Sequence, residues 1–467
     1  MAGAPASDLT SLTLCETAEL LRTKAASPVE LTRACLDRIQ RLNPALNAFI
    51  TLTADTALDQ ARLAEQEIVR GQWRGPLHGV PIALKDLIAT AGVRTTAASR
   101  VFAERIPPED AEVVRRLKAA GAVLLGKLNL HEFAYGGSGL ISAFGPARNP
   151  WSTARITGGS SSGPAAAVAA RLCYAALGTD TAGSIRLPAA CCGLVGLKPT
   201  YGLVSARGVV PLAWSYDHVG PMTRTVADAA ALLTVLAGYD PQDFTSRPFP
   251  PTDYASELAQ PAPPPRLGVA RDFFFSDLDP EAEACVHDAL GVLERLFAGL
   301  RDITLPVDTD RTAMVAEAWA FHEPLVAEHA ALYHPETLRR IRAGEQVSSA
   351  EYVRKRTQLD QMRRAAPELF RDVDLAVTPT IPAPPATFAQ LESAPAELRP
   401  HELLMLRNTR PFNVLGLPTI SLPCGFTRSG LPVGLQIAGR PGDEITVLRA
   451  ARAYERETEW HTRAPAL

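Results

Sequence analysis

Between Gly136 and Gly208 the chain is denser in small residues than anywhere else, and this feature constrains its fold most strongly. The region contains the segments YGGSGL, TGGSSSGPAAAVAARL, GTDTAGSIR and GLKPTYG. Glycine, serine and alanine let a backbone approach a ligand or another backbone closely. The pattern therefore predicts tightly approaching loops, and it places a serine, Ser184, and a basic residue, Arg186, among them.

Helix and strand signals before this region indicate an α/β sheet. The segment SPVELTRACLDRIQRLN predicts an amphipathic helix with Ser27 as N-cap, Pro28 as first helical residue and Glu30 completing a capping box. A second predicted helix, PPEDAEVVRRLKAAG, ends at Gly121 and leads directly into the apolar strand AVLLGKLN. A helix that continues into a strand is typical of α/β folds.

The remainder of the chain divides by composition. Residues 240–265 are rich in proline and predict an extended surface connection. A mainly helical stretch follows to about residue 370, and VDLAVTPTI and LPTISLPCGF then indicate strands. The proline-rich connection does not require two independent cores, so these patterns leave the number of domains open.

Composition and charge exclude several classes of protein. Of the 467 residues, 46% are hydrophobic and 21% charged, as in ordinary globular proteins. The net charge of −3 gives no field that attracts polyanions, so we expect no direct nucleic-acid partner. No apolar run approaches about 18 residues and the first residues do not resemble a secretion signal, so we expect a cytoplasmic protein without a membrane partner. Seven cysteines without C-x-x-C spacing argue against a disulfide framework or a zinc site.

Lys85 ends the hydrophobic run of GVPIALKDLI, where a charged side chain is unusual. One interpretation is that its amine reaches solvent or pairs with Asp86. The other is that burial lowers its pKa and makes it a base near neutral pH. The segment by itself leaves both interpretations open.

Candidate nucleophiles are the serines of two small-residue segments. Residues 159–163, GSSSG, match the nucleophile elbow of α/β-hydrolases, but that elbow must follow a strand, and the preceding NPWSTARIT is polar and contains proline. These serines are equally explained as helix caps or a plain loop. In DTAGS, consecutive backbone N–H groups beside Ser184 are suited to an oxyanion. Three histidines are interpreted as structural residues or residues at the edge of a pocket, rather than as catalytic bases: His131, His218 and His322.

Three motifs taken together resemble the amidase signature family. They are GVPIALKD, TGGSSSGPAAAVAA and GTDTAGSIRLPAACCGLVGLKPTYG, and the spacing of Lys85, Ser160 and Ser184 agrees with the family. Flanking segments such as KLNLHEFAYGG, FNVLGLPTISLPCGF and GLPVGLQIAGRP extend the resemblance over nearly the whole chain. It implies an α/β fold with one large domain, 1–467, whose central mixed, twisted β-sheet is covered by α-helices on both faces. The implied parts are N-terminal helices (1–70), a catalytic core (71–235), the proline-rich connection with a helical region (240–370), and strands and a helix completing the core (371–467).

The resemblance also implies the site. Ser184 is then the nucleophile, Ser160, at a cis peptide bond, is the bridging serine, and Lys85 is the base. The oxyanion hole is implied to consist of backbone N–H groups of Thr181, Ala182, Gly183 and Ser184. Supporting residues are implied to be Ser161, Asp180 and Arg186. No metal or cofactor is expected. Candidate substrate-binding residues are Tyr135, Gly136, Phe144, Trp319 and His322.

For the function, this resemblance leaves two possibilities. We expect a serine hydrolase that cleaves the C–N bond of carboxylic amides through an acyl-enzyme, with aryl esters or carbamates as side substrates. The alternative is the glutaminase component of a tRNA-dependent amidotransferase (its A subunit), which releases ammonia from glutamine for a partner. Such proteins carry a serine-, glycine- and tyrosine-rich segment after residue 330 and an asparagine-bearing helix before the final strands. This chain instead reads LYHPETLRRIRAGEQVSSAEYVRKR and HELLMLRNTRPFNVLG in these places. We therefore favour the hydrolase, with a small-molecule amide as its partner and a homodimer as the default assembly.

Overall fold

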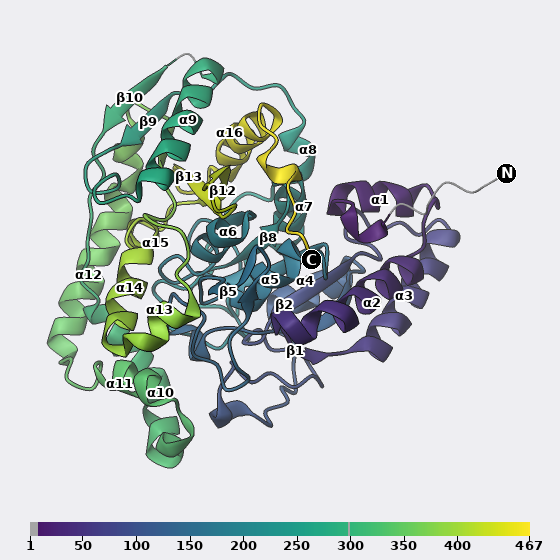
Figure 1. Ribbon diagram of the computed structural model, residues 1–467, viewed down its shortest axis with the longest axis horizontal. Coiled ribbons are helices and arrows are strands. Elements are labelled where there is room, and N and C mark those ends of the chain that lie inside the picture. Colours follow the sequence, from purple (N-terminus) through teal and green to yellow (C-terminus); the bar gives the residue numbers. More distant parts are fainter. Residues whose placement is uncertain (1–7, 298) are drawn as a thin grey trace.

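An 11-stranded mixed sheet runs through the molecule (Figure 1). The computed structural model describes residues 8–297 and 299–467. In their order across the sheet, the strands are β1 (Phe49–Leu52), β3 (Val123–Leu128), β2 (Pro81–Lys85), β6 (Ala175–Thr179), β8 (Val219–Thr223), β7 (Val195–Lys198), β12 (Thr419–Phe426), β13 (Pro432–Gly439), β11 (Leu375–Pro379), β9 (Leu267–Ala270) and β10 (Leu300–Ile303). A separate two-stranded sheet joins β4 (Arg148–Asn149) to β5 (Ser152–Ile156).

The middle of the sheet is buried on both faces. Every residue of β2, β6, β7 and β8 is buried, which explains why these segments are nearly continuous apolar runs without alternation. β2 is parallel to both of its neighbours, β3 and β6, whereas β6 and β8 are antiparallel. Because β2 and β6 are parallel, their carboxyl ends, Lys85 and Thr179, lie at the same edge of the sheet.

Helices cover both faces of this sheet. Gly434 and Gly439 lie an odd number of residues apart on β13 and therefore face opposite sides. A Cβ atom at Gly434 would meet Ala190, and one at Gly439 would meet Val447, so a different helix packs on each side. The helices are α1 (Leu14–Arg22), α2 (Pro28–Leu46), α3 (Ala54–Val69), α4 (Glu112–Ala119), α5 (Ser162–Ala169), α6 (Arg186–Cys192), α7 (Val226–Leu236), α8 (Tyr254–Leu258), α9 (Pro280–Leu296), α10 (Thr312–His329), α11 (Pro335–Arg342), α12 (Ser349–Ala365), α13 (Phe388–Ser393), α14 (Leu398–Met405), α15 (Arg410–Val414) and α16 (Glu444–Arg456).

The arrangement confirms the predicted fold class. Figure 1 shows α1 to α3 at one end of the molecule and α10 to α12 at the other. The predicted capping box of α2 is present, since Ser27 accepts the N–H of Glu30 and Glu30 accepts the N–H of Ser27. Within the residues that the structure describes, no helix combines the length and apolar character needed to span a bilayer.

Two local expectations differ from the structure. The stretch expected to be mainly helical also contains β9 and β10, which pair with each other, while β9 also pairs with β11. Each has only four residues, and tertiary pairing rather than local pattern stabilises such short strands. The polar segment before the GSSSG serines does contain a strand, β5, but β5 pairs with β4 outside the main sheet.

Candidate active site

Lys85 is fully buried at the carboxyl edge of the sheet and faces two hydroxyl groups. Its Nζ lies 2.8 Å from Oγ of Ser160 and 2.8 Å from Oγ1 of Thr179. Asp86 points elsewhere, because its carboxylate accepts hydrogen bonds from the backbone and side chain of Thr96. The interpretation of Lys85 as a solvent-reaching or Asp86-paired residue is therefore wrong.

Burial sets the protonation of this lysine. Removal from water lowers the pKa of Lys85 to about 7, although the charges of Asp180 and Asp217 oppose the shift. A large fraction of Lys85 is therefore neutral near pH 7. A neutral amine in contact with a hydroxyl is able to accept its proton.

The three serines at the site differ in exposure and in hydrogen bonding. The peptide bond between Gly159 and Ser160 is cis, and Ser160 is fully buried against Lys85. Ser161 is fully buried too, and its hydroxyl donates to the carbonyl of Thr179, so the elbow match does not describe an accessible nucleophile. Ser184 retains 5% exposure, and its carbonyl accepts the N–H of Ser161 at 3.3 Å. The two serine loops are thus in contact, with Ser184 on the more open side.

Backbone donors are free beside Ser184. Within residues 8–297 and 299–467, the N–H groups of four consecutive residues donate no hydrogen bond: Thr181, Ala182, Gly183 and Ser184. The next two N–H groups, of Ile185 and Arg186, donate to the carboxylate of Asp180 at 3.1 and 3.4 Å. Buried backbone donors are nearly always paired, so a run of free donors next to a serine is suited to a developing oxyanion.

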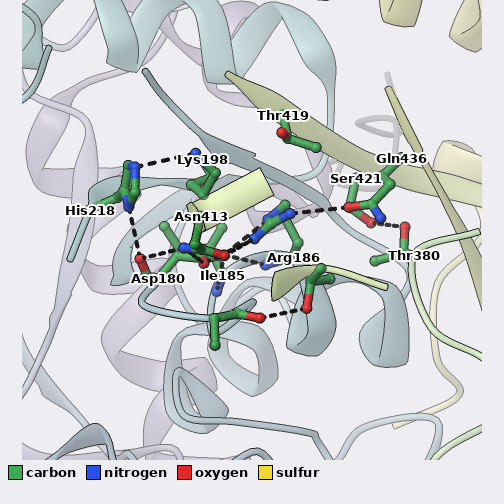
Figure 2. A network of polar contacts seen from close by, with 12 residues as sticks. Asp180, Ile185, Arg186, Lys198, His218, Thr380, Asn413, Thr419, Ser421 and Gln436 are labelled. Carbon is green, nitrogen blue, oxygen red and sulfur yellow. Dashed lines mark hydrogen bonds and ion pairs between the residues drawn. The ribbon is translucent and has the colours of Figure 1, made fainter. Parts of the chain in front are cut away.

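A buried ion pair joins Asp180 and Arg186, the residues that flank this loop in the chain (Figure 2). The guanidinium of Arg186 lies 3.1 Å from each carboxylate oxygen of Asp180 and also contacts the side chains of Asn413 and Gln436. Burial disfavours the charge of Asp180, but Arg186, Lys198 and Asn413 together outweigh it and lower the pKa of this carboxyl. Beside the pair, His218 lies 3.2 Å from Nζ of Lys198. Both ends of the Ser184 loop are therefore fixed.

Sequence reasoning missed three groups at this site. Thr179, the second partner of Lys85, precedes Asp180 in the GTD motif, of which only the aspartate was predicted to support the site. Asp217 accepts the hydroxyl of Thr181 at 2.5 Å, and burial raises its pKa to about 7 despite three hydrogen bonds. Glu402 is fully buried on α14 and accepts the hydroxyl of Ser138 at 2.7 Å. Asp217 and Thr181 line a pocket together with Thr179.

The candidate substrate-binding residues are spread over several places. Tyr135 is buried and its hydroxyl donates to the carbonyl of Arg340, while a Cβ at Gly136 would overlap the ring of His131. His322 is buried with its Nδ1 2.9 Å from the hydroxyl of Tyr333. Phe144 lies under the guanidinium of Arg94, and Trp319 is half-buried on α10 beside Gly344. Their part in substrate binding stays a prediction.

Comparison with known proteins identifies the family. The family model named Amidase matches residues 30–448. The chain belongs to the amidase family. A curated relative from Myxococcus xanthus, 44% identical over 98% of this chain and 100% of its own length, is named as the A subunit of glutamyl-tRNA(Gln) amidotransferase.

Solved amidase structures have the same fold. The A subunit of glutamyl-tRNA(Gln) amidotransferase from Thermotoga maritima is 34% identical, with a TM-score of 0.78 over 98% of this amidase and 97% of that chain. A 6-aminohexanoate cyclic dimer hydrolase complexed with substrate is 31% identical, with a TM-score of 0.89 over 98% of this amidase and 99% of that chain. The amidase signature resemblance and the α/β fold are therefore confirmed.

Two expectations about function and partners are wrong. We expected a stand-alone hydrolase of carboxylic amides that acts on a small molecule and has no nucleic-acid partner. Relatives that match nearly the whole chain are instead named as subunits of a tRNA amidotransferase. The expectation relied on two short segments after residue 330, whereas the match extends over 98% of the chain. The net charge also failed to indicate a nucleic-acid partner, because it describes one chain and not the surface of an assembly.

Proposed function

We propose that this amidase is the glutamine-hydrolysing component, the A subunit, of a glutamyl-tRNA(Gln) amidotransferase, and that it cleaves the side-chain amide of glutamine. The observation that carries the chemistry is the 2.8 Å contact between buried Lys85 and Ser160, next to the loop of Ser184. The observation that favours this substrate is the full-length match to proteins of that name. Such an enzyme acts in the cytoplasm and depends on the other components of its assembly.

In the proposed acylation step, Oγ of Ser184 bonds to the amide carbon. Its proton passes to Ser160, and the proton of Ser160 passes to neutral Lys85. The negative charge on the former carbonyl oxygen is stabilised by the free N–H groups of residues 181–184. When the C–N bond breaks, a proton returns through Ser160 to the leaving nitrogen, and ammonia departs.

Deacylation uses the same relay, with water in place of Ser184 as the nucleophile. A water molecule gives one proton to the relay while its oxygen bonds to the acyl carbon. The bond to Oγ of Ser184 then breaks, that oxygen regains a proton, and glutamate leaves. Because every proton moves between hydroxyl groups and Lys85, the proposed reaction uses side chains and backbone of this chain alone.

The proposal is tested by ammonia release from L-glutamine. The full chain, combined with its partner subunits and glutamylated tRNA, is expected to release ammonia, and the same assembly with Ser184→Ala is not. Ammonia release by the chain alone, measured in parallel, shows how far the reaction depends on the assembly. An intact assembly that releases no ammonia from glutamine would overturn the proposal.

The activity is expected to rise with pH through about 7. Lys85 is protonated below its pKa of about 7 and neutral above it, so the base form accumulates as pH increases. The measurement is kcat/KM for glutamine between pH 5.5 and 9.5. Since the charge of Asp217 raises the pKa of Lys85, Asp217→Asn is expected to shift the rise in kcat/KM to lower pH. A flat wild-type profile would contradict a neutral lysine base.

Gly183→Ala is expected to lower kcat/KM about 10- to 100-fold. Gly183 has a φ of 139°, and a Cβ atom there would lie 2.0 Å from Oγ1 of Thr409. That hydroxyl donates to the carbonyl of Ala182 at 2.6 Å, so the loop must shift to admit a methyl group. Ala182→Gly, which keeps the N–H, is the matched control and is expected to lose far less. Equal rates for Gly183→Ala and the wild type would show that the loop geometry does not matter.

A further inference from the structure

Arginine side chains gather beside the proposed active site from three separate elements. Arg311 immediately precedes α10, Arg399 lies on α14, and Arg410 begins α15. Burial, followed by the charges of Arg410 and Arg399, lowers the pKa of Arg311 to about 9. Their like charges are thus close enough to act on one another in a poorly hydrated place. Such an arrangement costs free energy unless an anion compensates it.

Two of these guanidinium groups have unused donors. Arg410 is only 4% exposed, and its Nη2 donates to the backbone carbonyl of Asp310. Its Nε and Nη1 are buried and have no partner in the described part of the chain. Arg311 is half-buried, and its guanidinium makes no hydrogen bond or ion pair to any described residue. Buried donors without acceptors, such as Nε and Nη1 of Arg410, are rare in native proteins and indicate an absent partner.

Nearby carboxylates are already engaged. Glu402 lies 2.7 Å from Nη1 of Arg340 and 3.3 Å from Nη1 of Arg399. Burial raises the pKa of Glu402, but nearby positive charges, among them Arg340 and Arg399, outweigh it and lower the value, so Glu402 is ionised. Asp308 and Asp310 pair with Nζ of Lys355 at 2.5 and 3.1 Å. Among the described residues, no carboxylate forms an ion pair with Arg311 or Arg410.

Arg410 is connected on two sides to the loop of residues 181–184. Thr409, the preceding residue, donates its hydroxyl to the carbonyl of Ala182 at 2.6 Å. On the other side, the guanidinium carbon of Arg410 lies 5.8 Å from the ring centre of Tyr216. The residue after Tyr216 is Asp217, which binds the hydroxyl of Thr181. Arg410 is therefore linked through its neighbours to the loop beside which the substrate carbonyl is proposed to lie.

We propose that Arg311, Arg399 and Arg410 bind a carboxylate of the amide substrate. Guanidinium groups match the geometry of a carboxylate and bind it more strongly than they bind neutral acceptors. Under the proposed function, on which the identity of the substrate rests, this group is the α-carboxylate of glutamine. Arg399 orients the site from its contact with Glu402, while Arg311 and Arg410 supply the unused donors.

Direct binding of glutarate tests the site without catalysis. The full chain carrying Ser184→Ala is titrated with glutarate, and with neutral glutaramide for comparison. Adding Arg311→Met or Arg410→Met is expected to weaken glutarate binding about 10- to 100-fold and to leave glutaramide binding unchanged. Arg271→Met, which removes an exposed arginine paired with Asp302, is the matched control and is expected to bind glutarate as before. Because Arg410 is buried, Arg311→Met covers the case in which Arg410→Met does not fold.

Kinetics of the assembly separate this inference from the proposed function. Arg311→Met is expected to raise KM for L-glutamine at least about 10-fold with a smaller effect on the methyl ester of glutamine, whose α-carboxyl is uncharged. Equal effects on both substrates, or glutarate binding unaffected by Arg311→Met, would overturn the carboxylate site. If the assembly releases no ammonia from glutamine but glutarate binding still requires Arg311, the proposed function fails and the carboxylate site stands.

Discussion

Ser184→Ala is expected to lower kcat for glutamine hydrolysis by a factor of about 10⁴ or more. Without Oγ of Ser184, no acyl-enzyme forms, and the free N–H groups of residues 181–184 can only polarise the amide for direct attack by water. Steady-state ammonia release measures kcat, and mass spectrometry of the quenched assembly shows whether the acyl-enzyme is present.

Lys85→Ala tests the same relay and is expected to lower kcat by about 10²- to 10⁴-fold, the usual contribution of a general base.

Ser162→Ala is the matched control for Ser184→Ala. Ser162 is fully buried at the start of α5, close to Ser160 in the chain, but its hydroxyl has no hydrogen-bond partner among the described residues. Its loss is therefore expected to leave kcat nearly unchanged. If Ser184→Ala retained substantial activity while Ser160→Ala lost it, the nucleophile would be Ser160, and the proposed relay would be wrong.

Arg186→Met is expected to reduce the free energy of unfolding by about 3 to 5 kcal/mol. Arg186 and Asp180 are both fully buried, and methionine is apolar and leaves the carboxylate of Asp180 charged and without its counterion. Urea denaturation followed by fluorescence measures the change. Because Asp180 also binds the N–H groups of Ile185 and Arg186, we expect the loop of Ser184 to lose order and kcat to fall as well.

Two comparisons make the stability prediction specific. Arg22→Met removes an exposed ion pair with Glu19 and is expected to leave the free energy of unfolding nearly unchanged. Combining Arg186→Met with Asp180→Asn removes the buried charge itself and is expected to recover part of the loss. An Arg186→Met protein as stable as the wild type would show that Asp180 is satisfied by Asn413 and the backbone without its arginine.

The sequence predicted those parts of the fold that depend on local physics. The capping box of Ser27 and Glu30 defines the start of α2 because both hydrogen bonds form within one turn. The strand ending at Leu128 follows from its apolar run. By contrast, β9 and β10 were missed, because four-residue strands are stabilised mainly by neighbours distant in the chain.

By itself the sequence determined the α/β class and the residue types that the chemistry needs, since Lys85, Ser160 and Ser184 stand in motifs that resemble one family. Only the tertiary structure decided their states. The pKa of Lys85 depends on complete removal from water, and its contacts with Ser160 and Thr179 join residues 75 and 94 positions away. The same holds for the arginines of the proposed carboxylate site, whose significance lies in donors left without acceptors. Solvation and hydrogen-bond pairing are properties of packed atoms, so no local pattern in the chain reveals them.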